Sequence, residues 1–154
     1  MSVKSEIKVI AKNRKAYHEY FVEEKYEAGI VLRGSEVKAL RNSNPSLQES
    51  YAMVRNSEVW LVGMHITTIL HASYNNHTER RERKLLLSKT QIKRLDQATR
   101  QKGYTLVPLE IYFNEDNRVK VEIGIGKGKA FHDKRQSTKE AEAKREMNRA
   151  LRKK

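Results

Sequence analysis

The feature that most constrains the fold of this chain is a strictly alternating segment at residues 118–125, which reads RVKVEIGI. Its apolar residues recur at every second position, which is typical of a β-strand with one buried face. Beyond Lys129 no long run of large apolar residues follows. We therefore predict two domains, a folded domain over residues 1–129 and a basic tail over residues 130–154.

Other segments show the same preference for β-structure. Residues 17–32, 51–54, 59–66 and 105–113 are rich in β-branched and aromatic side chains and alternate along much of their length. The segment RNSE at 55–58 predicts a hairpin turn. Gly29 predicts a bend or bulge in the first of these strands, and Pro108 predicts an edge or bulge in the last. One face of the first strand should carry Tyr20, Val22, Tyr26, Ala28, Ile30 and Leu32, and one face of the last should carry Thr105, Val107, Leu109, Ile111 and Phe113.

Two helices are predicted between these strands. Ser35 is a good N-cap for a short helix that ends before Pro45, and Ser88 with Gln91 forms a capping box for a longer helix closed by Gly103. Residues 1–16 are predicted to be a basic arm that orders only near Val9. About six strands with flanking helices predict a mainly β fold, an antiparallel β-barrel of the oligonucleotide-binding (OB) type.

The charge of the chain favours a polyanionic partner. The 154 residues carry a formal net charge of +13. Residues 130–154 contain nine Lys and Arg against four Asp and Glu, a net of +5, which leaves +8 for residues 1–129. Cations near phosphates release condensed counterions, so a surplus spread over both domains favours nucleic acid over a membrane surface.

Several other classes of function are disfavoured. There are no cysteines, no signal peptide pattern and no apolar stretch of membrane-spanning length, so we expect a soluble, cytoplasmic protein. The five histidines lack the spacing of a metal site, and no nucleophile or phosphate-loop motif is present. We expect no metal, no cofactor and no enzymatic activity.

The residues around the start of the first strand favour RNA recognition. Lys12, Arg14, Lys15 and His18 alternate with Asn13 and Tyr17, a combination that can contact the backbone and stack a base. Glu27 is an acid in a basic protein, either a solvated strand residue or an acceptor for base edges or riboses. In the tail, Ser137 and Glu140 form a capping-box pattern, and we expect it to be disordered when free and helical when bound. The alternative is a helix packed back on the barrel.

Several longer motifs occur in order along the chain. They are NRKAYHEYFVEEKYEAGIVLRGSEVKALR (13–41), EVWLVGMHI (58–66), RKLLL (83–87), KGYTLVPL (102–109), VKVEIGIGKGK (119–129) and HDKR (132–135). Together they resemble the SsrA-binding protein (small protein B) family of bacteria. Two departures occur: the loop before RKLLL reads NNHTERRE where the family usually has an Asp-Pro pair, and Ala130 replaces a lysine that commonly follows KGK.

The resemblance implies an RNA-binding role in trans-translation. Members of this family bind the tRNA-like domain of transfer-messenger RNA (SsrA) through an OB-type barrel. They accompany it, charged with alanine and bound to elongation factor Tu, to stalled ribosomes, where the C-terminal tail enters the empty mRNA channel near the decoding centre of the small subunit. By position in the shared motifs, the resemblance implies RNA-binding roles for Asn13, Arg14, His18, Glu27, Arg83, Lys84, Leu86, Lys120, Lys127 and Lys129. In the tail it implies decoding-centre roles for His132, Asp133, Lys134 and Arg135. It also implies a monomer.

Two other functions fit parts of the pattern. A ribosomal or translation-associated protein that binds structured RNA would share the charge and the tail but not the joint motifs. A small RNA-cleaving enzyme using His18 with Glu19 or Glu24 is the other alternative, and it would reveal itself by RNA cleavage on prolonged incubation.

Overall fold

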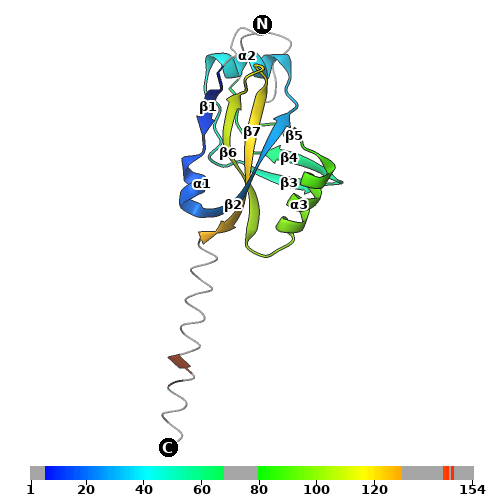
Figure 1. The fold of residues 1–154 in the computed structure, drawn as a ribbon. Coiled ribbons are helices and arrows are strands. Elements are labelled where there is room, and N and C mark those ends of the chain that lie inside the picture. The colour runs from blue at the N-terminus through cyan, green and yellow to red at the C-terminus, as the bar shows by residue number, and fades with distance from the viewer. Residues whose placement is uncertain (1–5, 68–79, 130–143, 146, 148–154) are drawn as a thin grey trace, which may run out of the picture.

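The computed structural model describes residues 6–67, 80–129, 144–145 and 147. Three helices and seven strands make up this part of the chain (Figure 1). The strands are β1 (Lys8–Lys12), β2 (Tyr20–Ile30), β3 (Tyr51–Arg55), β4 (Glu58–Val62), β5 (Arg83–Leu86), β6 (Tyr104–Phe113) and β7 (Val119–Gly128). The helices are α1 (Arg14–Glu19), α2 (Gly34–Asn42) and α3 (Lys89–Thr99).

The strands form one antiparallel sheet that closes on itself. Its order is β1-β6-β3-β4-β5-β2-β7, and a further pairing between β6 and β7 completes a barrel of six strands, while β1 lies outside it, on β6. The predicted antiparallel barrel with flanking helices is confirmed. Strand β1 lies in the segment that we expected to be an arm, ordered only near Val9. It is ordered because its backbone pairs with Glu110–Phe113 of β6, and no side-chain pattern in the sequence predicts this pairing.

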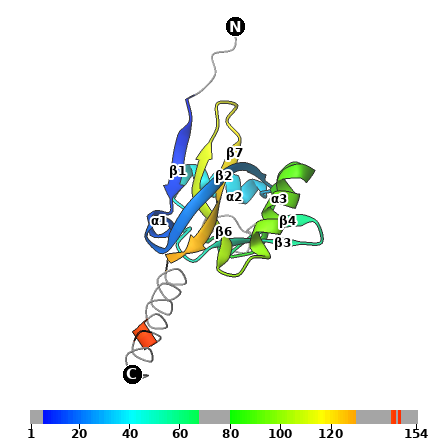
Figure 2. The same ribbon diagram turned by 60° about the horizontal axis from the view of Figure 1, so that its bottom comes forward.

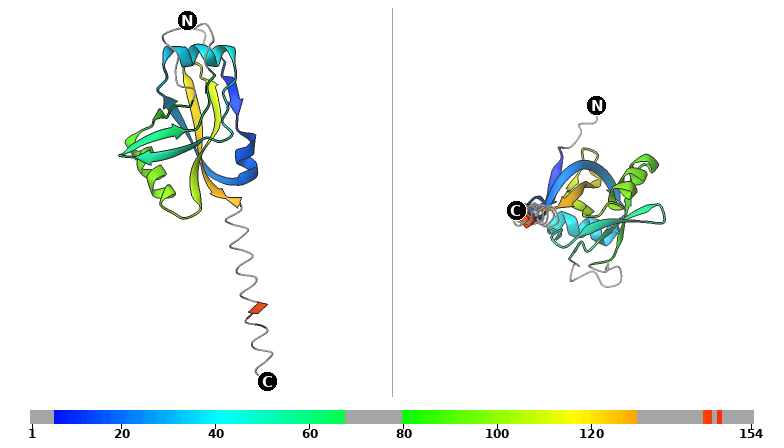
Figure 3. Two further views of the ribbon diagram at one scale, coloured as in Figure 1. Left: turned by 180° about the vertical axis from the view of Figure 1, so that it is seen from behind. Right: turned by 90° about the horizontal axis from the view of Figure 1, so that it is seen from below.

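The helices cover an end and a side of this barrel. Helix α2 lies across one end, α3 lies beside β3 and β4, and α1 connects β1 to β2 at the opposite end (Figures 1 and 2). Seen from behind, the β3–β4 hairpin projects to one side, and the view from below shows the strands curving around the barrel (Figure 3). No helix in the described ranges has the length and apolar character needed to cross a membrane.

The barrel interior contains the alternating residues of β7. Val121, Ile123 and Ile125 are at most 1% exposed and belong to one cluster with residues of the other strands and of α3. The members contributed by other elements include Ala28, Val59, Leu61, Leu85, Leu95, Leu106 and Ile111. The predicted inward face of this strand is therefore confirmed.

The strands on both sides of β7 each contain a β-bulge, and these bulges change which residues point inward. One lies between Val22 and Glu24 of β2, and the other between Pro108 and Glu110 of β6. A bulge adds one residue to one strand and so exchanges its two faces. The expectation of a single apolar face along each strand was therefore wrong, as was the position of the β2 bulge near Gly29.

The bulges place a small apolar cluster outside the barrel. It consists of Ala16 of α1 with Val107 and Leu109 of β6, and Tyr20 and Val22 pack against it. The cluster also covers the outer face of β7 at Gly124, where a Cβ atom would lie 2.9 Å from both Leu109 Cδ1 and Val22 Cγ1. A larger residue at this position would collide with the cluster on which α1 rests.

Local sequence signals account for most of the turns and caps. Ser88 and Gln91 form the predicted capping box of α3, and Asn56 and Ser57 turn the β3–β4 hairpin with φ of 52° and 60°. Two expectations were wrong. Tyr17 lies in α1 rather than in a strand, because Asn13 caps a helical turn there. Helix α2 begins at Gly34, before the expected cap, because the Glu36 carboxylate accepts a hydrogen bond from the Arg33 N–H.

Candidate nucleic-acid interface

Two predicted site residues, Leu86 and Lys120, lie on either side of Gly29 on the outer face of β5, β2 and β7. In the strand register Gly29 of β2 lies opposite Leu86 on one side and Lys120 on the other. A Cβ at Gly29 would lie 3.3 Å from the Leu86 Cβ and 3.7 Å from the Lys120 Nζ, so glycine leaves room for both side chains. Leu86 is 51% exposed, so its apolar side chain is accessible at the surface. Leu86, Gly29 and Lys120 are hereafter called the outer row.

Glu27 lies on the same outer face, two residues before Gly29. Its side chain is exposed, and its carboxylate accepts a hydrogen bond from the Tyr112 hydroxyl of β6. Opposite it on β7 is Glu122, which forms an ion pair with Lys25 at 3.9 Å. The outer row thus borders a patch of carboxylates, which can accept hydrogen bonds but repel phosphates.

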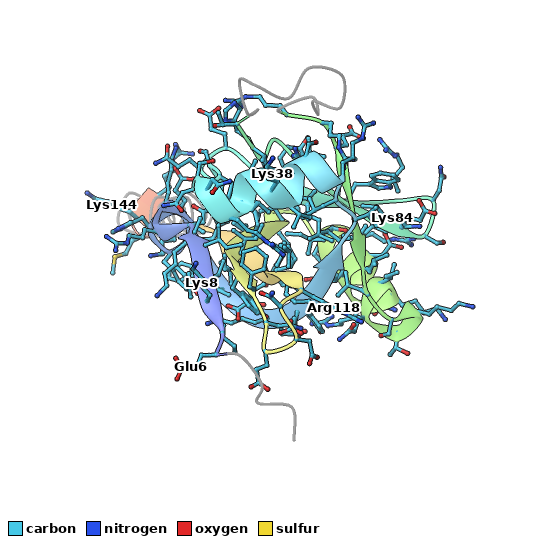
Figure 4. The ribbon with its side chains drawn as sticks, turned by 90° about the horizontal axis from the view of Figure 1, so that it is seen from above. Glu6, Lys8, Lys38, Lys84, Arg118 and Lys144 are labelled. Atoms are coloured by element: carbon cyan, nitrogen blue, oxygen red, sulfur yellow. The ribbon has the colours of Figure 1, made fainter. Side chains whose placement is uncertain are left out.

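Lys84 extends the outer face toward β4. It points outward like Leu86, and its Nζ lies 3.2 Å from a Glu58 carboxylate oxygen, with both side chains partly exposed. An exposed ion pair of this kind contributes little to stability, so Lys84 can leave Glu58 and pair with a phosphate at little cost. Figure 4, a view onto the end of the barrel covered by α2, shows Lys8, Lys38, Lys84 and Arg118 spread around its edge.

A second group of predicted residues lies on and beside α1. Arg14 and His18 are exposed on the helix. Lys129, just after β7, donates a hydrogen bond to the Tyr17 carbonyl at 2.8 Å, which places it against the same helix. It also lies 5.1 Å from the centre of the Phe21 ring. Lys127 lies 5.9 Å from the Tyr104 ring at the end of the barrel.

Exposed aromatic rings accompany these cations. Tyr17 is 47% and Phe21 45% exposed. The Lys25 ammonium lies 5.6 Å from the Tyr17 ring, and a hydrogen bond with the Tyr17 hydroxyl, together with the nearby Glu122 carboxylate, raises the pKa of Lys25. Alternating lysines and exposed rings are the usual composition of a surface that binds single-stranded bases.

Asn13 occupies a different environment from the one its predicted role suggests. Its side chain is 3% exposed and donates hydrogen bonds to the carbonyls of Pro108 at 3.0 Å and Leu47 at 3.2 Å, while its Oδ1 accepts from the Ala16 N–H. These bonds join α1, the bulge of β6 and the segment before β3. For Asn13 the structure favours support of α1 over direct contact with RNA.

Arg83 is also buried, with no exposed side-chain area. Its Nε donates to Glu36 of α2 at 2.5 Å and its Nη1 to the Met64 carbonyl at 2.8 Å. Arg81 also pairs with Glu36. Burial alone would raise the pKa of Glu36, but the Arg33 N–H and the two guanidinium groups outweigh it and lower this pKa. Arg83 therefore fixes α2 onto β5 rather than presenting its charge outward.

Four residues of this region were not predicted as part of a site. Phe21, Gly29, Glu36 and Tyr112 looked like ordinary strand or helix residues, because what they do depends on neighbours in other strands. Only the pairing of β2 with β5 and β7 brings Gly29 between Leu86 and Lys120. The tail residues His132, Asp133, Lys134 and Arg135 lie outside the described residues. Within the described tail, Lys144, Arg145 and Met147 are helical and exposed.

The described residues contain no group of three or more His, Cys, Asp and Glu side chains arranged to hold a metal ion. What they present is a closed antiparallel barrel whose outer face and first helix carry exposed cations and rings. This combination defines an OB-type barrel suited to binding a nucleic acid.

Comparisons with known proteins identify the family. The model of the SmpB protein family matches residues 10–153. The SsrA-binding protein of Symbiobacterium thermophilum is 52% identical over 149 residues, covering 97% of this chain and 94% of the relative. That of Rickettsia bellii is 50% identical over 147 residues, covering 96% and 97%. A solved structure described as "tmRNA-SmpB: a journey to the center of the bacterial ribosome" is 45% identical, with a TM-score of 0.66 over 77% of this chain and 83% of that one. The chain belongs to the SmpB protein family.

Proposed function

We propose that this protein binds the tRNA-like domain of transfer-messenger RNA and delivers it to stalled ribosomes for trans-translation. The observation that carries the proposal is the match to the SmpB family over residues 10–153, together with relatives named SsrA-binding protein at about half identity over nearly the whole chain. The solved relative described with transfer-messenger RNA in the bacterial ribosome supports the same partners.

In this proposal the barrel of residues 1–129 binds the RNA. The five exposed or half-exposed cations, Arg14, Lys84, Lys120, Lys127 and Lys129, neutralise phosphates, and each contact releases about one counterion. His18 and Glu27 make directional hydrogen bonds to sugars or base edges, and Leu86 offers an apolar contact. Asn13 and Arg83 act from inside the fold, by holding α1 and β5 in place.

The tail of residues 130–154 acts on the ribosome in the same proposal. We place His132, Asp133, Lys134 and Arg135 at the decoding centre, where His132 stacks on a base, Asp133 caps a helix and the two cations pair with ribosomal phosphates. The remainder occupies the empty mRNA channel as a helix. The protein acts as a cytoplasmic monomer alongside elongation factor Tu with alanyl-transfer-messenger RNA, and it performs no catalysis itself.

A competition titration at physiological salt tests the RNA partner. The full-length protein is bound to the tRNA-like domain of transfer-messenger RNA and challenged with excess ordinary tRNA. The complex is expected to survive, because the directional contacts add to the electrostatic ones. Displacement by an equal concentration of ordinary tRNA would show that the protein binds polyanions in general, and it would contradict the proposal.

Truncation after Gly128 tests the division between the two domains. The truncated protein is expected to keep nearly all of its affinity for the tRNA-like domain but to lose tagging of nascent chains on stalled ribosomes. The matched control is the full-length variant with Lys134 and Arg135 both replaced by alanine, which should behave in the same way. A large loss of RNA affinity on truncation would show that the tail belongs to the RNA-binding site.

A further inference from the structure

The Glu27 carboxylate is held by a residue that no motif identified. Tyr112 lies on β6 and Glu27 on β2, and these strands are separated by β7. In the register Tyr112 lies opposite Lys120 of β7, whereas Glu27 lies opposite the neighbouring outward residue, Glu122. The tyrosine therefore reaches across β7 on the outer face to donate its hydroxyl hydrogen to Glu27.

The two residues differ in their freedom to move. Tyr112 is only 6% exposed, so its ring is fixed by packing, whereas Glu27 is exposed. An exposed glutamate normally samples several rotamers and must give up that freedom when it binds a ligand. A fixed donor on one carboxylate oxygen removes much of this freedom in advance. The other oxygen stays available on the outer face, next to the outer row.

From this geometry we infer that Tyr112 is a positioning residue for RNA recognition, which orients the Glu27 carboxylate to accept a hydrogen bond from a donor group of the bound RNA. The inference rests on the proposed function and extends it to the source of specificity. Donors of this kind are ribose 2′-hydroxyls and exocyclic amino groups of bases.

The surroundings suit such a role better than a purely structural one. Glu27, Glu122 and Glu110 occupy facing positions on β2, β7 and β6, so this patch repels phosphates and favours neutral hydrogen-bond donors. Burial, together with these carboxylates, raises the pKa of Tyr112, so its hydroxyl remains a donor at every working pH. Lys120 and Lys84 lie on the same outer face and can hold the backbone while Glu27 contacts a sugar or base.

The chain provides a matched control for this pair. Tyr104 also lies on β6 and donates its hydroxyl, at 3.1 Å, to a glutamate of β2, Glu23, at the other end of the barrel. Replacing either tyrosine by phenylalanine keeps the ring and removes one hydroxyl. The two variants therefore differ in which glutamate is released.

The test is a double-mutant cycle on affinity for the tRNA-like domain of transfer-messenger RNA, using the full-length protein. Tyr112→Phe is expected to weaken binding by about 2- to 10-fold, the cost of fixing one long side chain on binding. Tyr104→Phe should leave the affinity unchanged. In a Glu27→Ala background Tyr112→Phe should have no further effect, because the group it orients is gone.

A structural role would give a different pattern. If Tyr112→Phe lowered affinity equally with and without Glu27, or not at all, the inference would be overturned. Melting temperatures of all variants define a temperature at which each is folded, and affinities are compared there. Single 2′-deoxy substitutions and removal of single amino groups in the RNA then show which donor loses its effect in Tyr112→Phe. If the wild-type protein itself did not prefer this RNA over tRNA, the proposed function would fail rather than the role of Tyr112.

Discussion

Replacing Arg83 by methionine separates support of the fold from contact with RNA. Methionine keeps much of the apolar stem but removes the guanidinium group. Glu36, which is fully buried, would then retain Arg81 and the Arg33 N–H as donors, and the Met64 carbonyl would lose one donor. Breaking a buried ion pair by removing one partner costs about 3–5 kcal/mol. Because Arg81 remains, we expect about 3 kcal/mol, the lower end of that range.

This loss is large against the total stability of a domain, which is about 5–15 kcal/mol. For a chain of this size each kcal/mol corresponds to about 2–4 °C, so the melting temperature should fall by about 6–12 °C. Urea and thermal unfolding, both monitored by circular dichroism, measure these two changes. RNA affinity is measured at a temperature at which the variant is folded. Affinity there should change little. In the double variant with Glu36→Leu, part of the stability should return, because the fully buried carboxylate is removed and Arg81, whose side chain is 21% exposed, is the only one of its former charged partners that remains.

The neighbouring Lys84→Ala variant is the control, because Lys84 is partly exposed on the same strand. It should change stability by no more than about 0.5 kcal/mol. It should also weaken RNA binding and flatten the salt dependence by about one counterion. The reasoning would be refuted if Arg83→Met left the urea midpoint unchanged and lowered RNA affinity instead. Arg83 would then be a direct contact and the buried pair with Glu36 would contribute nothing to the fold.

Three further predictions concern other parts of the barrel. Gly124→Ala should destabilise by about 1–3 kcal/mol because its outer face is already filled, whereas Gly34→Ala, with open space around it, should be neutral or stabilising in the same urea titration. Hydrogen bonds from Arg94 and Tyr26 lower the pKa of Glu24 from 4.5 to about 2. The ionised Glu24 therefore stabilises the fold fully above pH 4.5, and this contribution is lost as the pH falls toward 2. Glu24→Gln should therefore show a shallower acid decline in urea midpoint than the wild type, and an equal decline would contradict this assignment. Lys120→Ala should reduce the salt slope of RNA binding by about one; an unchanged slope would remove this residue from the interface.

Local patterns were sufficient to predict much of this fold. The alternation along β7 and the Ser88 capping box each depend on residues close in sequence, and both occur as predicted. The bulge of β6 lies where Pro108 predicted one, but the bulge of β2 was expected near Gly29 and lies between Val22 and Glu24. A bulge is defined by pairing with another strand, so its effect on the two faces was not predicted, and Val22 and Leu109 point outside the barrel. The sheet partner of β1 was hidden for the same reason.

The candidate site shows the same limit. Residue type and family motif identified Glu27, Lys84 and Leu86, which the structure places on one outer face. They also suggested Asn13 and Arg83 as contacts, but nothing in their types reveals that both are buried. Burial of a guanidinium depends on a partner carboxylate that lies 47 residues away, on α2. Such pairs appear only once the topology is known.

The closure of the barrel through β7 has a consequence for how the chain folds. This strand is the last of the barrel in sequence, yet it pairs along its length with both β2 and β6. The pairing with β2 joins segments about a hundred residues apart, and contacts this distant slow folding to about milliseconds to seconds. A nascent chain that stops before Val119 leaves β2 and β6 with unpaired edges, a state prone to aggregation. Completion of synthesis through Gly128 is therefore the step that commits the chain to its native barrel.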